Sequence, residues 1–176
     1  MELEQILYNV QKPTWYSGGE YGAVVKDKKD VNIRFAFCFP DLYEIGMSHL
    51  GIKILYDCLN KVPDIWCERV FMPNDDMEEE MKKNNISLFA LESKDSIKDF
   101  DFIGFTIQYE MCYSTILEML SLAEVPLLAK DRKQGDPIII GGGPCACNPE
   151  PVADFFDLFS IGEGENNLVE LAELFK

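Results

Sequence analysis

Five short apolar stretches recur along the chain, and segments with helical periodicity separate most of them. The stretches cover residues 33–39, 65–71, 100–107, 137–142 and 156–162. Most are apolar almost throughout and rich in β-branched and aromatic residues, which is typical of strands buried on both faces of a sheet. The pattern therefore predicts a central sheet that is covered by helices on both sides.

Between these stretches, apolar residues recur three or four positions apart and so fall on one stripe of a helix. The stripes comprise Met47, Leu50, Gly51, Ile54, Leu55 and Cys58, then Tyr113, Ile116, Leu117 and Leu120, and finally Leu168, Leu171, Ala172 and Phe175. A further helix is predicted over residues 75–83. Alternating strands and helices predict an α/β fold: a doubly wound, mainly parallel five-stranded sheet in the order 2-1-3-4-5, flavodoxin-like or Rossmann-like.

The first part of the chain does not follow this alternation. A short helical start is followed by PTWYSGGEYG and then by the charged stretch KDKKD, which reads as a turn. We therefore expect residues 1–30 to form an N-terminal arm packed outside the sheet. Residues 31–176 are expected to form one α/β domain, since their length suits a single core.

Composition limits which kinds of partner the chain is expected to bind and in which compartment it is expected to work. The formal net charge is −15, which opposes direct binding to nucleic acid or to an anionic membrane surface. The start of the chain lacks a signal sequence, and no apolar run is long enough to cross a bilayer. We expect a cytoplasmic protein whose six cysteines are reduced thiols.

Ligands of open parallel sheets bind beyond the carboxyl ends of the strands, so the loops there are the place to look for chemistry. FPDLYEIGMSHLG follows the first strand, TIQYE the third, GGGPCACNPEP the fourth and GEGEN the fifth. The glycines at 141–143 would let a flat ligand approach the backbone closely, or they would simply form a tight turn. Both interpretations stay open at this point.

Three other α/β families need different residues in these loops. A phosphoacceptor receiver needs an aspartate after the third strand and a lysine after the fifth, where this chain has Thr106 and Gly162. A flavodoxin-type flavin site needs a loop rich in Ser and Thr after the first strand. A dinucleotide fold needs G-x-G-x-x-G there, whereas GEGENN comes after the fifth strand and carries two acids. These three classes are excluded.

The loops resemble, in order, those of cobalamin-binding domains. DLYEIG resembles the D-x-H-x-x-G motif, with a tyrosine where the histidine would stand, and TIQ falls where such domains carry Ser or Thr. The three glycines fall at their Gly-Gly turn, and GEGE resembles the motif after the last strand of cobalamin-binding radical S-adenosylmethionine (radical SAM) proteins. The resemblance implies a cofactor site made of Asp41, Tyr43, Gly46, Thr106, Gln108, Gly141, Gly142, Gly143, Gly162, Glu163 and Gly164.

Longer strings extend the resemblance over residues 17–170. They are GGEYG, FPDLYEIGMSHLGIKILY, ERVFMPNDDMEEEM, LFALES, FDFIGFTIQYE and IIIGGGPCACNPEPVADFFD. Together they resemble the N-terminal cobalamin-binding-like domain of a radical SAM family of the Fe-S oxidoreductase type. The resemblance implies a radical SAM domain C-terminal to residue 176, which would be the partner of this domain and would hold the 4Fe-4S cluster and S-adenosylmethionine.

Two features qualify what this segment does. It has no C-x-x-x-C-x-x-C run, so we expect no cluster, no metal site and no catalytic residue within it. A phenol is a poor cobalt ligand, so Tyr43 predicts that any cobalamin binds without a histidine ligand, and His49 is interpreted as a structural or surface residue. The alternative is a degenerate, cofactor-free domain that recognises substrate or docks on the radical SAM barrel. The substrate and reaction of the parent enzyme are not encoded in this segment.

Overall fold

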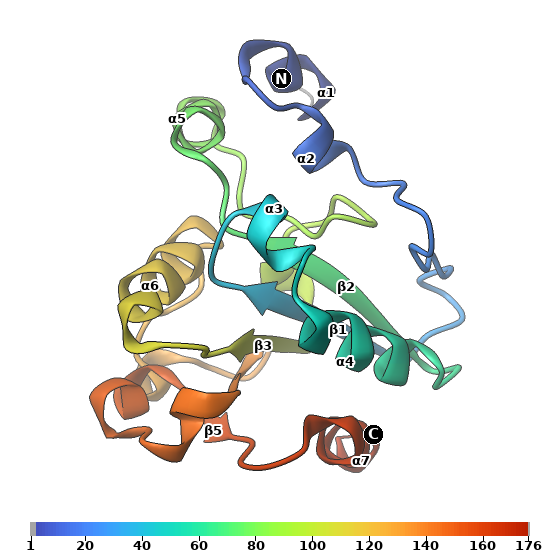
Figure 1. Ribbon diagram of the computed structural model, residues 1–176, viewed down its shortest axis with the longest axis vertical. Helices are drawn as coiled ribbons and strands as arrows, with labels where there is room; N and C mark the ends of the chain where they lie inside the picture. The colour runs from blue at the N-terminus through green and yellow to red at the C-terminus, as the bar shows by residue number, and fades with distance from the viewer. Residues whose placement is uncertain (1–2, 176) are drawn as a thin grey trace.

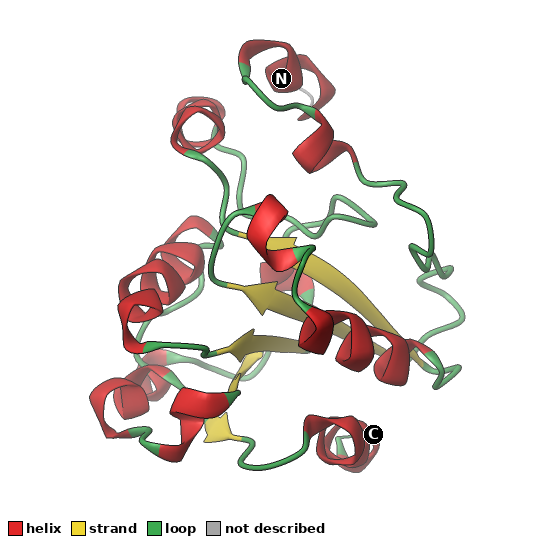
Figure 2. Cartoon of the chain, viewed as in Figure 1, coloured by secondary structure: helices red, strands yellow, loops and turns green. Residues whose placement is uncertain are grey.

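The computed structural model describes residues 3–175. Its strands form one sheet that is parallel throughout, in the order β2-β1-β3-β4-β5 (Figures 1 and 2). The strands are β1 (Ile33–Phe39), β2 (Ile65–Phe71), β3 (Phe102–Thr106), β4 (Ile138–Gly142) and β5 (Leu158–Phe159). The predicted α/β class and the predicted strand order are both confirmed.

The last strand is shorter than the sequence predicts. It pairs with β4 only through Leu158 and Phe159, although the apolar stretch runs over 156–162. Phe156 is buried, but it packs its ring against Phe105 beneath the sheet instead of extending the ladder. Beyond the strand, Gly162 has a φ of +101° and turns the chain toward the next helix.

Helices cover both faces of the sheet. On one face, α4 (Leu50–Asn60) and α7 (Gly164–Leu174) pack side by side over the phenylalanines of β1. On the other face lie α6 (Tyr113–Leu122) and α5 (Asp75–Asn84). Shorter helices are α1 (Leu3–Ile6), η1 (Leu7–Asn9), α2 (Thr14–Ser17), α3 (Tyr43–Gly46), η2 (Ile97–Asp99), η3 (Glu110–Cys112), η4 (Ala129–Asp131), η5 (Pro144–Cys147) and η6 (Glu150–Phe155). Within residues 3–175, no helix combines the length and the apolar character needed to span a membrane.

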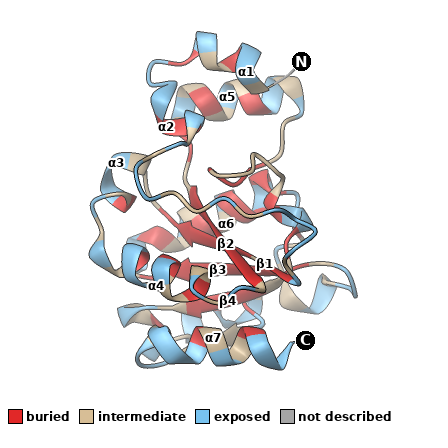
Figure 3. Cartoon of the chain, turned by 90° about the vertical axis from the view of Figure 1, so that its right-hand side faces the viewer, coloured by how far each residue is buried: buried red, intermediate tan, exposed pale blue. Residues whose placement is uncertain are grey.

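The start of the arm lies outside the sheet, beside α5, and its apolar side chains contribute to the core. Ile6, Val10, Trp15 and Tyr16 are buried in the same cluster as the inward side of α5. Figure 3 shows the arm helices beside α5, above the buried residues of the sheet. The sheet does not cover all of the apolar side of α5. The apolar side chains of the arm cover the rest and remove it from water.

The second half of the arm crosses the edge of the sheet at β2. The Trp66 indole donates a hydrogen bond to the carbonyl of Val24, with a distance of 3.0 Å. The ammonium group of Lys26 donates to the carbonyls of Asn60 and Val62, which lie at the end of α4, at 2.9 and 2.8 Å. A cation suits this place because the last carbonyls of a helix lack partners within the helix.

Candidate functional site

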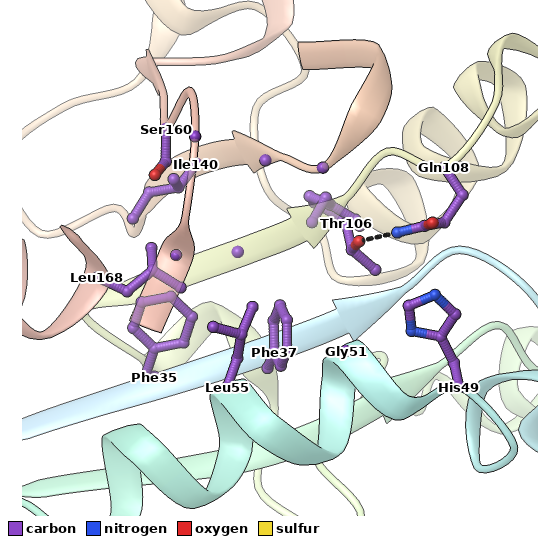
Figure 4. A pocket seen from close by; sticks show the side chains of 16 residues that line it. Phe35, Phe37, His49, Gly51, Leu55, Thr106, Gln108, Ile140, Ser160 and Leu168 are labelled. Carbon is purple, nitrogen blue, oxygen red and sulfur yellow. Dashed lines mark hydrogen bonds between the residues drawn. The ribbon is translucent and has the colours of Figure 1, made fainter. Parts of the chain in front are cut away.

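A cavity of about 180 Å³ lies between the sheet and the helices α4 and α7, toward the carboxyl ends of the strands (Figure 4). Its lining consists of Phe35, Phe37, His49, Gly51, Leu55, Gly104, Phe105, Thr106, Gln108, Ile140, Gly142, Gly143, Ser160, Gly162, Gly164 and Leu168. This is the place where open parallel sheets bind ligands. We call it the slot.

Glycines keep the slot open. A methyl group added at Gly104 would stand 2.7 Å from the ring of Phe35, so this position has no room for a side chain. At Gly142 the nearest heavy atom would be 3.8 Å away, so the space above this glycine belongs to the slot itself. Gly143 has a φ of +92°, which side chains disfavour, where the chain leaves β4. The glycines therefore leave backbone as one wall of the slot.

The opposite wall is apolar and partly aromatic. Figure 4 shows Phe35 and Phe37 from β1 lying along the slot, with Leu55 of α4 next to them and Leu168 of α7 facing them. Alternate residues of β1 point to this face, because successive side chains of a strand point to opposite sides. A narrow space between bare backbone and aromatic rings suits a flat, mainly apolar ligand.

Polar groups lie at one end of the slot. The side-chain amide of Gln108 donates to the hydroxyl of Thr106, just beyond β3. The imidazole of His49 caps α4: its Nδ1 accepts a hydrogen bond from the backbone N–H of Ile52, at 3.4 Å. A methyl group at Gly51 would come within 2.9 Å of the His49 ring, so the glycine leaves room for the imidazole.

A further polar group, Ser160, lies on the other side of the slot from His49 (Figure 4). Its Oγ is buried, and it has no hydrogen-bond partner within residues 3–175. Buried hydroxyl groups normally have a partner, so this lone one is an exception, and its burial keeps it out of reach of a ligand in the slot.

The structure brings together only some of the residues that the sequence predicts for the site. Thr106, Gln108, Gly142, Gly143, Gly162 and Gly164 line the slot. Asp41, Tyr43, Gly46, Gly141 and Glu163 are absent from its lining. Asp41 and Tyr43 therefore lie outside the slot that the other loops form.

Tyr43 faces the arm instead of the slot. Its ring stacks on Trp15 with 6.1 Å between ring centroids, and its hydroxyl donates to Glu20 at 3.0 Å. Burial, aided by the hydrogen bond to Glu20, raises the pKa of the Tyr43 phenol to about 12. The loop after β1 folds into the short helix α3, and this turns the side chain away from the carboxyl ends of β3 and β4.

The remaining predicted residues have packing or loop roles. Asp41 accepts a hydrogen bond from the hydroxyl of Tyr109, at 3.1 Å, and so joins the loops after β1 and β3. Gly141 lies against Phe159, whose ring would stand 2.7 Å from an added methyl group. Gly46 likewise lies against an aromatic ring of β2, and Glu163 is the exposed residue before α7.

His49 is the functional candidate that the sequence interpretation missed, and Ser160 is a further lining residue that it did not name. Only the position of His49, directly before an apolar helical stripe and next to the carboxyl edge, pointed toward the site. Ser160 gave no signal, because a lone serine at the end of a strand is common. Within residues 3–175, no group of three or more His, Cys, Asp or Glu side chains is arranged to hold a metal ion.

Comparison with known proteins places the chain among radical SAM proteins. A family model described as the N-terminal part of radical SAM proteins matches residues 51–176. A protein of Methanocaldococcus jannaschii, described as uncharacterized protein MJ0966, is 31% identical over 139 residues, which are 77% of this chain and 25% of that protein. The chain thus spans a quarter of the length of this relative. Because the family model covers most of the chain, the chain belongs to the family of N-terminal domains of radical SAM proteins.

Proposed function

We propose that this chain is the cobalamin-binding-like domain of a radical SAM protein, and that the slot takes the nucleotide tail of a corrinoid. The observation that carries the proposal is the slot itself: an apolar, glycine-walled cavity lined by Thr106, Gln108, Gly142, Gly143, Gly162 and Gly164. The resemblance in sequence assigns these residues to a cofactor. The fold leaves the slot open at the edge where sheets of this type bind ligands.

The size of the slot fits the tail of a corrinoid and not its macrocycle. An engineered cavity of about 150 Å³ holds one benzene molecule. A slot of about 180 Å³ that is open to solvent therefore accepts a flat heteroaromatic ring, whereas the much larger corrin ring would remain outside. The rings of Phe35 and Phe37 would contact the face of the inserted base, and the backbone at Gly142 and Gly143 would contact its edge.

A bound corrinoid supplies a cobalt centre that can carry a methyl group or transfer electrons. This domain would bind and orient the cofactor, and no residue of the chain is assigned a catalytic role. Tyr43 donates its hydrogen bond to the arm, and Nδ1 of His49 is engaged in capping α4. The Tyr43 hydroxyl keeps its proton and points to the arm, and the lone pair of His49 Nδ1 is engaged, so we propose that the cobalt has no protein nitrogen ligand.

The rest of the protein belongs to the proposal as well. We place the 4Fe-4S cluster and S-adenosylmethionine in a radical SAM domain C-terminal to residue 176, which would be the direct partner of this domain. The net charge of −15 supports a role without direct contact with nucleic acid or anionic membranes, and we propose the cytoplasm as its location.

A binding titration tests the proposal. The chain is titrated with hydroxocobalamin, and binding is followed by calorimetry and by retention of the cofactor on desalting. Gly142→Val puts two methyl groups beyond its Cβ into the space of the slot, and the Cβ itself is accommodated, since no atom lies closer than 3.8 Å to it. We expect this variant to bind at least about tenfold more weakly, which corresponds to about 1.4 kcal/mol. Ala153→Val adds two methyl groups at an exposed position outside the slot and serves as the control.

One result would refute the cofactor proposal. If the folded chain retains no corrinoid at about 100 μM, any complex is weaker than about −5.5 kcal/mol. That outcome favours the alternative function, a cofactor-free module that recognises substrate or docks on the radical SAM barrel. The contacts of Tyr43 favour this alternative. Its side chain stands where the motif has its ligand, yet it stacks on Trp15 and donates a hydrogen bond to Glu20, both in the arm.

A further inference from the structure

One nitrogen of the His49 imidazole lies at the slot without a partner. Its other nitrogen, Nδ1, accepts from the backbone N–H of Ile52 at 3.4 Å, so the neutral ring carries its proton on Nε2. The ring also lies against Phe39, with 5.2 Å between ring centroids, and Gly51 leaves room for it. In the described part of the chain, Nε2–H has no acceptor. The capping of α4 therefore fixes both the tautomer and the place of an unused hydrogen-bond donor.

A ligand in the slot can reach this donor. The buried side-chain atoms that lack a partner within residues 3–175 do not include Nε2 of His49, so this unpaired nitrogen is open to solvent. The same holds for Oε1 of Gln108, whose amide donates through its nitrogen to the hydroxyl of Thr106. Figure 4 shows His49 on one side of the slot, and Gln108 and Thr106 on the other side, where β3 ends. This polar end thus offers an accessible donor and an accessible acceptor.

The polar end is also free of charge. Among the described residues, no Asp, Glu, Lys or Arg lines the slot, although the chain has 31 acidic and 16 basic residues. An anionic group such as a phosphate would lose water there without meeting a cation, which costs free energy. A hydroxyl group carries no charge, and it can both donate and accept a hydrogen bond. The polar end therefore suits hydroxyl groups of a ligand better than its phosphate.

The order of groups in a nucleotide tail matches this division of the slot. The base would lie along Phe35 and Phe37, and the group joined to the base is a ribose. Two hydroxyl groups of this ribose are free in a corrinoid, because the third is esterified to the phosphate. One hydroxyl can meet each residue at the polar end, so no single atom has to reach both His49 and Gln108.

We infer that the polar end of the slot binds the ribose of the tail, with His49 and Gln108 as the residues that recognise its hydroxyl groups. Nε2–H of His49 donates to one hydroxyl oxygen, and Oε1 of Gln108 accepts from the other hydroxyl. The phosphate then lies outside the slot. The inference rests on the proposed function, because it concerns the same slot and the same class of cofactor.

The test uses the nucleoside without the corrin. α-Ribazole, the nucleoside of cobalamin, is titrated into the whole chain and compared by calorimetry with a dideoxy analogue that lacks the two hydroxyl groups in question. Base and sugar ring are the same in both, so only the hydroxyl groups distinguish them. We expect α-ribazole to bind about tenfold more tightly. Hydroxocobalamin is titrated in parallel as the measure of the proposed function.

Two variants assign the preference to residues. His49→Asn removes the donor at Nε2 while an asparagine oxygen still caps α4. Gln108→Met removes the acceptor and keeps a side chain of similar length. Each variant should lower the preference about threefold by weakening only α-ribazole. Gln134→Met, at an exposed position outside the slot, is the matched control and should keep the full preference.

The outcomes separate the two proposals. If neither hydroxocobalamin nor α-ribazole binds, the proposed function fails, and this inference fails with it. If hydroxocobalamin binds while α-ribazole does not, or binds no more tightly than its analogue, the inference is overturned and the proposed function stands. If only α-ribazole binds, with the expected preference, the ribose site stands and the corrinoid proposal fails.

The variants add a separate criterion. A preference for α-ribazole that survives unchanged in folded His49→Asn and Gln108→Met would refute the assignment to these residues. The comparison on the unmodified chain remains decisive even if a variant does not fold.

Discussion

The ion pairs that attach the arm to β2 allow a quantitative test of the structure. The side chain of Arg69 is 8% exposed, and it binds Glu20 through Nη2 at 2.9 Å and Glu92 through Nε at 2.6 Å. The side chain of Glu92 is 1% exposed, and its second oxygen accepts the backbone N–H of Arg69 at 2.8 Å. Arg69→Met keeps much of the side-chain volume and removes the charge, so it leaves Glu92 buried without its cation.

Removing one partner of a buried ion pair costs about 3–5 kcal/mol, because the remaining charge stays away from water. The methionine side chain recovers some apolar contact with Tyr56, over whose ring the guanidinium lies at 5.0 Å. We therefore expect the free energy of unfolding to fall by about 3 kcal/mol near neutral pH. Urea denaturation followed by circular dichroism measures this loss.

The loss should depend on pH in a defined direction. Burial raises the pKa of Glu92, and Arg69 acts against this shift. A raised pKa in the folded state means that the folded protein binds more protons, so stability decreases as pH rises from the unfolded pKa through the folded pKa. Without Arg69 the pKa of Glu92 rises further. The deficit of Arg69→Met should therefore be largest near neutral pH and shrink as the pH is lowered toward about 4.5.

A double-mutant cycle isolates this cause. Adding Glu92→Gln to Arg69→Met removes the unpaired charge, so it should restore part of the lost stability at neutral pH and abolish the dependence on pH. A deficit below about 1 kcal/mol, within the range of an exposed ion pair, would refute the claim that the pair is buried. So would a deficit that does not change between neutral and acid pH.

Three further substitutions have defined outcomes. Gly51→Ala should weaken corrinoid binding in a titration because the added methyl group displaces the His49 ring, and it should change the melting temperature little, since the helix preference of alanine, up to about 1 kcal/mol, is offset by the loss of the His49 cap. Tyr43→Phe should lower the free energy of unfolding by about 1 kcal/mol without changing corrinoid affinity. In the unmodified protein, the pKa of about 12 keeps the Tyr43 phenol protonated, so its hydrogen bond to Glu20 should be lost only as pH rises from 10 through about 12, as ultraviolet titration would record. Lys26→Met should cost about 1–2 kcal/mol in urea denaturation, through the carbonyls left unpaired at the end of α4.

The sheet could be predicted from the sequence because its signals are local. The mainly apolar runs at 33–39 and 65–71 coincide with β1 and β2, and the helical stripes fall on α4, α6 and α7. The fifth strand was predicted too long, because a run of apolar residues does not reveal where the ladder stops and core packing begins. The burial of the arm against α5 could not be predicted, because a short helix with few apolar residues gives no sign of the partner that buries it.

Only the part of the site that is formed by backbone could be predicted from the sequence. The glycines at 142, 143, 162 and 164 follow strand ends, and strand order alone brings those ends together. The side chain of Tyr43 could not be placed from sequence, because its direction depends on α3 and on contacts with Trp15, far away in the chain. The structural role expected for His49 is that of the cap of α4, while its place beside the slot could not be predicted, since a helix cap and a cavity residue look alike until the fold is known.

The position of β1 has a consequence for how far the folding unit extends. The match of the family model begins at residue 51, within α4, yet β1 precedes this point and stands between β2 and β3. A fragment starting at residue 51 would present two bare strand edges where β1 belongs and would leave the inward faces of α4 and α7 without the aromatic rings that cover them. Such a fragment should aggregate. The stretch that the family model matches and the stretch that must be synthesised together to fold therefore have different beginnings.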